Sequence, residues 1–524
     1  MVPMSDFIVL IWVGFIFFGT VFFSCNSVVQ LFQNNRIKFD RGFFLSLSAC
    51  LVALILCLSI WPPLHRVYDD EPAYVSQSYN ILSLGKPSVT IKGSRLQPEI
   101  FDRWTSDPKL PGYAWLEAVV LFLTKDFEQS YFMLNIVLGV LSVALLYRIA
   151  WLWTASNAVA WWAAIFLACL PARVTYSMSA GSDIAGLFFF LLFLYFISEF
   201  RSLNDKSMLY AAIFGGLFSI CVKPLYGIFV VFGLAGAMYI YQRNGLLDRK
   251  LRVQILMDTV CLSLPILISI PVFLIYELKH RLFAFSFISE NLFTSIFYLF
   301  DYKQNTILTV LAAIVAAGWG VFYKKDNLVI ALTGWFLTGF LMFSMFCAGG
   351  FSYPGQCYSD RYFLFFAFPF VLLAAKGMAD TLTGGYPRLL GTLFFMVLVI
   401  NAFFASNHLA CEAKNDFYNK ETLLLRKVFP FIPNDAYIID KGAVLVTMIS
   451  TKRSILTDLF VNGFHPKKVV FMKGIYDNFY DPYDAKNSVL IIRILDTTYH
   501  CKPLFTSLLK EADLSATPLL CERN

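Results

Sequence analysis

Residues 42–71 read GFFLSLSACLVALILCLSIWPPLHRVYDDE, an apolar run followed closely by the acids Asp69, Asp70 and Glu71. An apolar helix of roughly 20 residues is long enough to cross the hydrocarbon core of a bilayer. A carboxylate at the end of such a helix can stay ionised beside the apolar layer, where it is suited to taking a proton from a hydroxyl group. The structural alternative is that these acids only complement the dipole of the next helix.

Apolar runs of this kind recur over most of the chain. Its 524 residues are 58% hydrophobic and only 15% charged, which is typical of a polytopic membrane protein. We predict an all-α membrane domain of about twelve spanning helices. Their expected positions are residues 7–31, 42–63, 130–150, 157–171, 183–200, 207–221, 224–241, 254–277, 305–323, 328–347, 361–380 and 389–408. The first run is long and lacks a basic leader, which predicts a retained helix and not a cleaved signal peptide.

The Lys and Arg residues predict the orientation of these helices. Short basic clusters between apolar runs mark cytoplasmic loops, so the net charge of +7 indicates topology and not nucleic-acid binding. This assignment places the N-terminus on the extracytoplasmic side of the membrane. It places loops 64–129, 171–182, 278–304 and 348–360, and the tail, on the extracytoplasmic face.

The chain is expected to form two domains. Residues 1–408 form the membrane domain, with a catalytic first outer loop at 64–129. Residues 409–524 carry short apolar runs broken by Pro, Gly, Asn and Asp, which predicts a small extracytoplasmic α/β domain. The apolar segment 113–124 is too short to span and is expected to lie in the interface.

The eleven cysteines show no spacing typical of a metal site. Most stand alone inside apolar runs, where a free cysteine is usually a small buried side chain. Cys347 and Cys357 flank one short outer loop, and a disulfide between them is an open alternative in an oxidising compartment.

Charged residues converge on the predicted outer face. Besides the first-loop acids, they are Lys109 in a Pro-rich turn, Asp183 at the start of an apolar run, Lys223 between two runs, and Arg361. Each has a simpler role as a helix cap or a headgroup anchor. Together they suit group transfer from a lipid phosphate, in which cations hold the leaving phosphate and a carboxylate accepts a proton.

The order of these motifs resembles that of the GT-C glycosyltransferases, in particular the branch of protein O-mannosyltransferases and the lipid A aminoarabinose transferase. DEPAY at 70–74 resembles the acidic first-loop motif, and PKLPGY at 108–113 is similar to the Lys/His-Pro-Pro-Leu-Gly-Tyr turn. Lys223-Pro224 falls where the family has Arg-Pro or Lys-Pro. Asp360-Arg361-Tyr362 resembles the late Glu-Arg-Tyr motif. The chain departs from the pattern in its extra N-terminal helix and in the Pro pair that Lys109-Leu110 splits.

The resemblance implies transfer of a sugar from a polyprenyl-phosphate or dolichyl-phosphate donor to a glycan, lipid or protein acceptor, with inversion. The catalytic residues would be Asp70 as the base, Glu71 and Asp183. The residues implied for the donor phosphate are Lys109, Arg361 and Lys223, and those for substrate positioning are Tyr74, Tyr113 and Tyr362. No cofactor is expected, although Asp69, Asp70 and Asp183 offer oxygen ligands if a divalent metal takes part.

Two readings compete with an enzyme. A transporter or flippase of a lipid-linked saccharide also has many spans, but such proteins usually show internal repeats and charges near the bilayer midplane. A non-catalytic relative is not expected to keep Asp70. The C-terminal residues 521–524 carry no retention signal, which favours a bacterial inner membrane over the endoplasmic reticulum.

Overall fold

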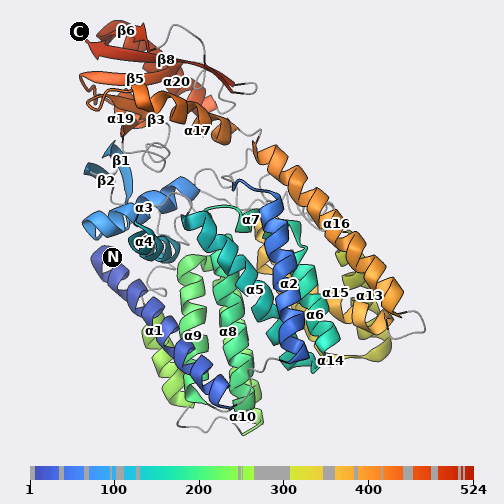
Figure 1. Cartoon of the computed structure of the whole chain (residues 1–524). Helices are drawn as coiled ribbons and strands as arrows, with labels where there is room; N and C mark the ends of the chain where they lie inside the picture. Colours follow the sequence, from blue (N-terminus) through green and yellow to red (C-terminus); the bar gives the residue numbers. More distant parts are fainter. Residues whose placement is uncertain are drawn as a thin grey trace.

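The computed structural model describes residues 6–34, 40–63, 70–94, 97–101, 111–125, 130–203, 205–245, 250, 252–264, 307–345, 360–382, 387–414, 417–440, 452–473, 482–504, 509–511 and 514–524. A bundle of helices occupies one end of the molecule and a sheet the other (Figure 1). Helices α3 and α4 lie between these two parts.

The membrane part is built from α1 (Asp6–Gln33), α2 (Arg41–Ser59), α3 (Asp70–Leu84), α4 (Gly112–Thr124), α5 (Ser130–Thr154), α6 (Asn157–Ala168), α7 (Pro171–Ser177), α8 (Asp183–Leu203), α9 (Lys206–Val222), η2 (Pro224–Tyr226), α10 (Gly227–Arg243), α13 (Ile307–Gly318), η4 (Trp319–Lys324), α14 (Asn327–Met345), η6 (Asp360–Phe365), α15 (Ala367–Thr381) and α16 (Pro387–Lys414). Seven helices among the described residues are long and apolar enough to cross a membrane, or eight if the bent pair α6–α7 is one span. The expected number of about twelve stays a prediction.

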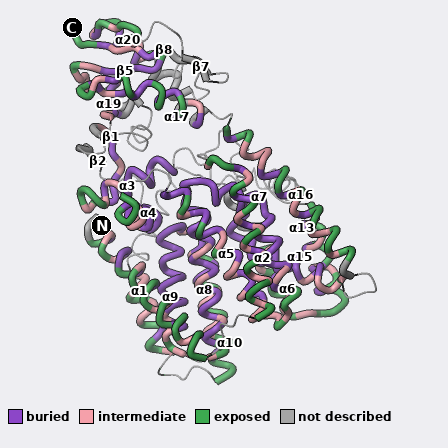
Figure 2. Tube along the Cα trace, viewed as in Figure 1, coloured by how far each residue is buried: buried purple, intermediate pink, exposed green. Residues whose placement is uncertain are grey.

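The bundle exposes apolar side chains where a soluble protein would bury them. Helix α8 is mostly buried, whereas α1, α10 and α16 show long exposed stretches (Figure 2). On α1, Phe18 is 63% exposed and Phe22 60% exposed. Exposed apolar faces of this extent mark contact with lipid or another hydrophobic partner. We therefore treat the bundle as the membrane-embedded part of an integral membrane protein.

The extra N-terminal helix packs against the bundle. The ring of Phe17 lies 4.8 Å from that of Trp115 on α4, and Phe23 stacks on Phe214 of α9 at 5.3 Å. Trp12 Nε1 donates a hydrogen bond to Leu262 O at 3.1 Å. Helix α1 thus supports α4 from the side of the bundle.

The C-terminal part contains α17 (Phe417–Val428), η7 (Phe429–Phe431), β3 (Tyr437–Asp440), β4 (Arg453–Leu456), α19 (Thr457–Val461), β5 (Lys468–Lys473), α20 (Pro482–Thr498), β6 (Tyr499–Pro503), β7 (Leu509–Glu511) and β8 (Leu514–Arg523). Strand β3 pairs in parallel with β4 and β5, and β8 is antiparallel to β5 and β6. The expected division of the chain at residue 408 is not tested, and α16 continues to Lys414.

The sheet also contains two strands from the loop at 64–129. The hairpin of β1 (Val89–Ser94) and β2 (Gln97–Phe101) extends the sheet in the order β2-β1-β4-β3-β5-β8-β6. At the junction, Lys92 is opposite Ile455 and Gly93 is opposite Ser454. Lys92 Nζ also lies 3.8 Å from the centre of the Phe464 ring. The first loop and the tail therefore share one sheet.

Helix α3 is tied to this hairpin. The amide of Asn80 on α3 donates to Ser88 O at 2.7 Å and to Thr90 Oγ1 at 3.1 Å. The backbone N–H of Thr90 donates to Ser76 Oγ at 3.0 Å. All four residues are buried. The sheet thereby positions the helix that begins at Asp70.

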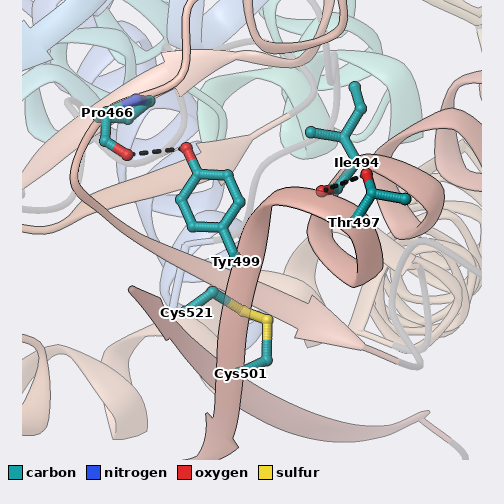
Figure 3. Close-up of a disulfide and its surroundings, with 6 residues drawn as sticks. All are labelled: Pro466, Ile494, Thr497, Tyr499, Cys501 and Cys521. Carbon is teal, nitrogen blue, oxygen red and sulfur yellow. Dashed lines mark hydrogen bonds between the residues drawn. A yellow bond between two sulfur atoms is a disulfide. The ribbon is translucent and has the colours of Figure 1, made fainter. Parts of the chain in front are cut away.

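A disulfide closes the far edge of the sheet. Cys501 of β6 is directly opposite Cys521 of β8, and their sulfurs are bonded (Figure 3). Beside it, the Tyr499 hydroxyl donates to Pro466 O at 2.7 Å. This pairing was not anticipated, because the two cysteines lie in different strands. Cys347 and Cys357 are outside the described residues.

Replacing both cysteines by serine is expected to destabilise the C-terminal sheet by about 3 kcal/mol, because the disulfide restricts the unfolded chain. Hydrogen exchange of the amides in β5, β6 and β8 measures this loss. Mass spectrometry of the wild type without reductant is the control. Free thiols at both positions in protein from native membranes would contradict the disulfide.

Candidate functional site

A buried ion pair joins the start of α8 to the end of α9. Lys223 Nζ lies 2.8 Å from Asp183 Oδ1, and the two residues are 8% and 2% exposed. Gly186 permits this contact, since a Cβ there would lie 3.0 Å from the Cβ of Lys223 and 2.8 Å from the Tyr226 ring. Ser219 Oγ also donates to Gly186 O at 3.2 Å. The sequence predicts both charged residues on one face, and here they neutralise each other.

Helix α3 presents one polar face to α4. Glu71, Tyr74 and Ser78 follow the spacing i, i+3, i+7 and therefore lie on the same side of α3. This side of α3 is buried, and Glu71 is 0% exposed. The Tyr74 and Tyr113 rings meet edge to face at 5.1 Å between centroids. The acidic loop motif thus continues into a protein interior instead of a solvated surface.

The neighbouring helix contributes a second buried carboxyl group, Glu117, which is also 0% exposed. Its Oε2 lies 3.0 Å from Ser78 Oγ. Burial raises the pKa of Glu117 well above its usual range; Ser78 and Tyr113 lower it in part, and the charge of Glu71 raises it. Burial, followed by Glu117 and Glu71, likewise raises the pKa of the Tyr113 hydroxyl.

Contacts of Asn135 and Ser182 connect α3 and α4 to the loop that precedes Asp183. Asn135 Nδ2 on α5 lies within hydrogen-bond distance of Tyr113 Oη at 3.0 Å, Ser179 O at 2.7 Å and Gly181 O at 2.8 Å. Ser182 Oγ lies 3.2 Å from the Tyr74 hydroxyl. The carboxyl groups of α3 and α4 and the Asp183–Lys223 pair therefore belong to one connected polar region.

A glycine brings α4 against the end of α9. A Cβ at Gly112 would lie 2.5 Å from the carbonyl carbon of Cys221, so a larger residue would push the two backbones apart. Cys221 is two positions before Lys223. Tyr113 consequently lies at the junction of α4 with the helix that ends at the lysine.

The other expected site residues are only partly placed. Asp70 is the first residue of α3, and Arg361 and Tyr362 lie in η6, but the side chains of these three are not described. The Phe365 ring of η6 is 4.5 Å from Tyr226, which places that segment beside η2. Lys109 and Asp69 lie outside the described residues. A shared position of Asp70, Lys109 and Arg361 stays a prediction.

Three buried polar residues were missed from the sequence. Glu117 and Asn135 sit inside apolar helices, where a single polar residue every few turns was the only available signal. Arg173 on α7 is 0% exposed, and its guanidinium reaches the carbonyls of Ala53 and Ala168. The guanidinium donates hydrogen bonds to backbone carbonyls of α2 and of the bend between α6 and α7, so Arg173 has a structural role.

No group of three or more residues able to hold a metal ion occurs in the described part of the chain. Of the carboxylates considered as metal ligands, Asp183 is paired with Lys223. The described residues thus supply the buried carboxyl groups of Glu71 and Glu117, tyrosine hydroxyl groups, and a lysine that is paired with Asp183. Such groups can orient a hydroxyl group and hold protons.

Comparisons with known proteins identify the fold. No protein-family model and no curated protein matches the chain. Among solved structures, ArnT from Cupriavidus metallidurans bound to undecaprenyl phosphate is similar with a TM-score of 0.54 and 12% identity, over 91% of this chain and 97% of that chain. An oligosaccharyltransferase from Archaeoglobus fulgidus matches with a TM-score of 0.49 and 11% identity, over 89% of this chain and 69% of that one. The likeness to ArnT confirms the expected GT-C fold.

A double-mutant cycle tests the ion pair. Asp183→Asn and Lys223→Met are each expected to destabilise the protein by about 3–5 kcal/mol, because each leaves one buried group without its partner. The double variant should lose less than the sum of the two. Thermal unfolding in detergent measures all four proteins. Additive losses would show that the two side chains do not stabilise each other.

Proposed function

We propose that the chain is an integral membrane glycosyltransferase that moves a sugar from a polyprenyl-phosphate donor to an acceptor on the extracytoplasmic face. The observation that carries this proposal is the GT-C fold shared with ArnT over nearly the whole of both chains. The buried carboxyl groups and the Asp183–Lys223 pair next to the first loop support it. The ArnT structure was solved with undecaprenyl phosphate, which suggests this class of donor.

The proposed reaction is a single displacement. The acceptor oxygen attacks the anomeric carbon, the bond from that carbon to the phosphate oxygen breaks, and the acceptor proton passes to a carboxylate. The configuration of the sugar inverts, and polyprenyl phosphate leaves with the bonding electron pair. Phosphate is a good leaving group, so cations that stabilise it are enough and no general acid is needed.

We assign the base to Asp70. It begins α3, whereas its neighbour Glu71 is fully buried. Lys109 and Arg361 are proposed to hold the donor phosphate. Lys223 is a weaker candidate for that task because Asp183 already neutralises it. Tyr74 and Tyr113 are proposed to position substrate groups through the contacts of α3 and α4.

The orientation of the site has its own support. A disulfide such as Cys501–Cys521 persists in oxidising compartments. The first-loop hairpin belongs to the same sheet as these cysteines, which supports a site on the same side of the membrane as the disulfide. We propose the periplasmic face of a bacterial inner membrane, with a glycan, lipid or protein as acceptor.

The test compares wild type, Asp70→Asn and Asp496→Asn, the last being an exposed carboxylate of α20. Each is reconstituted with polyprenyl-phosphate sugars and a mixed acceptor extract, and free polyprenyl phosphate is measured. Asp70→Asn is expected to lose about 10²- to 10⁴-fold in turnover, the usual contribution of a general base. Asp496→Asn should match the wild type.

Movement of saccharide across the bilayer without donor turnover would contradict the enzyme and favour a flippase. Equal turnover by Asp70→Asn would contradict the assigned base alone.

Turnover by the wild type is also expected to persist in excess EDTA, because carboxylate and phosphate-binding cations suffice for the proposed displacement. A loss that Mg²⁺ or Mn²⁺ restores would show that a divalent metal takes part.

A further inference from the structure

The carboxyl group of Glu117 differs from those of Asp183 and Glu199, two other buried acids in the described structure. Asp183 is 2.8 Å from Lys223, and Glu199 is 3.2 Å from a guanidinium nitrogen of Arg148. No cation lies within ion-pair distance of Glu117 among the described residues, although it is 0% exposed. An unpaired charge in such a place is strongly disfavoured, and the group usually becomes neutral instead.

The surroundings of Ser78 also indicate that the carboxyl group of Glu117 is neutral. Ser78 Oγ lies 2.7 Å from Tyr74 O, 2.9 Å from Ala114 O and 3.0 Å from Glu117 Oε2. A hydroxyl group has one proton to donate and two lone pairs that accept. The two carbonyl oxygens can only accept. The contact with Glu117 becomes a full hydrogen bond when the carboxyl group carries a proton and donates it to Ser78 Oγ.

We propose that Glu117 is a positioning residue that works as a neutral carboxylic acid and, by donating to Ser78, holds α4 against the helix that carries Asp70 and Glu71. Its effect on sugar transfer rests on the proposed function. Its protonation state rests only on the geometry of α3 and α4. Glu117 keeps its proton throughout the reaction, and the proton of the acceptor goes to Asp70.

The position of Glu117 explains why its state matters for the site. On α4, it lies one turn after Tyr113, which Asn135 connects to the loop before Asp183. On α3, Ser78 lies on the same face as Glu71. A charged Glu117 would bring a second negative charge to the buried face of Glu71 and separate the two helices.

The groups around Glu117 determine the sign of its pH dependence. Glu71 of α3 and Tyr113 of α4 are the titratable groups that act on it, while α5 adds the uncharged Asn135 and the end of α9 the buried Cys221. Burial raises the pKa of Glu117, so the unfolded chain loses this proton at a lower pH than the folded protein. Stability therefore falls as the pH rises between the two pKa values.

The experiment uses the full-length chain and compares Glu117→Gln with Glu117→Ala. Glutamine is neutral and its amide can still donate to Ser78, so it should rescue most of what alanine removes. Alanine is expected to lose on the order of 100-fold in turnover, as a small displacement of catalytic groups can. Activity and thermal unfolding are both recorded between neutral and alkaline pH.

Wild-type turnover should fall as the pH rises through the range in which Glu117 ionises, and Glu117→Gln should lack this decline. The melting temperature of Glu117→Gln should match or exceed that of the wild type at neutral pH and fall less as the pH rises. Glu199→Gln, which breaks the ion pair with Arg148, is the matched control and should melt lower than the wild type.

A Glu117→Gln protein that melts as low as Glu117→Ala would show that Glu117 is charged and would overturn the proposal. Equal turnover by Glu117→Ala and the wild type would contradict the positioning role of Glu117. If no donor is turned over by the wild type, the proposed function fails, and the melting temperatures still decide whether Glu117 is neutral.

Discussion

The contact between Asp183 and Lys223 is the interaction on which the arrangement of the sheet-proximal end of the bundle depends. A buried ion pair tolerates little displacement, because separating the charges leaves each one without compensation. Here the pair sets the start of α8 against the end of α9. The loop before Asp183 is held by Asn135, and the start of α4 is held by the close approach of Gly112 to Cys221. These contacts therefore fix the positions of α3 and α4 relative to the Asp183–Lys223 pair.

The mixed sheet supplies the second constraint. Strands β1 and β2 come from the loop that contains the acidic motif, and they pair with strands that follow the last membrane helix. The short strand β4 would otherwise leave an unpaired backbone edge. Because Asn80 and Ser76 join α3 to β1, the sheet restrains the helix that begins at Asp70. A rigid support of this kind is needed wherever a carboxylate must be held at a defined distance from a substrate.

Between these two constraints lies an interior that is polar although it is closed to solvent. Glu71 on α3 and Glu117 on α4 are both 0% exposed. The tyrosines and Ser78 around them provide hydroxyl groups that can donate or accept. Such a region specifies one arrangement of its helices only if every proton is correctly placed. The protonation of Glu117 is thus part of how the first loop is held.

Much of the fold and part of the candidate site could be predicted from the sequence, because hydropathy, basic clusters and short motifs are properties of neighbouring residues. The membrane class and the charged positions Glu71, Asp183 and Lys223 followed from such local patterns, and the GT-C fold was implied by the resemblance of short motifs to that family. Only the tertiary structure decided that Lys223 neutralises Asp183, that Glu117 is buried against Ser78 of α3, that Cys501 bonds to Cys521, and that the first-loop hairpin joins the C-terminal sheet. Each of these joins residues from different elements, and no periodicity along one segment encodes which distant segment it will meet.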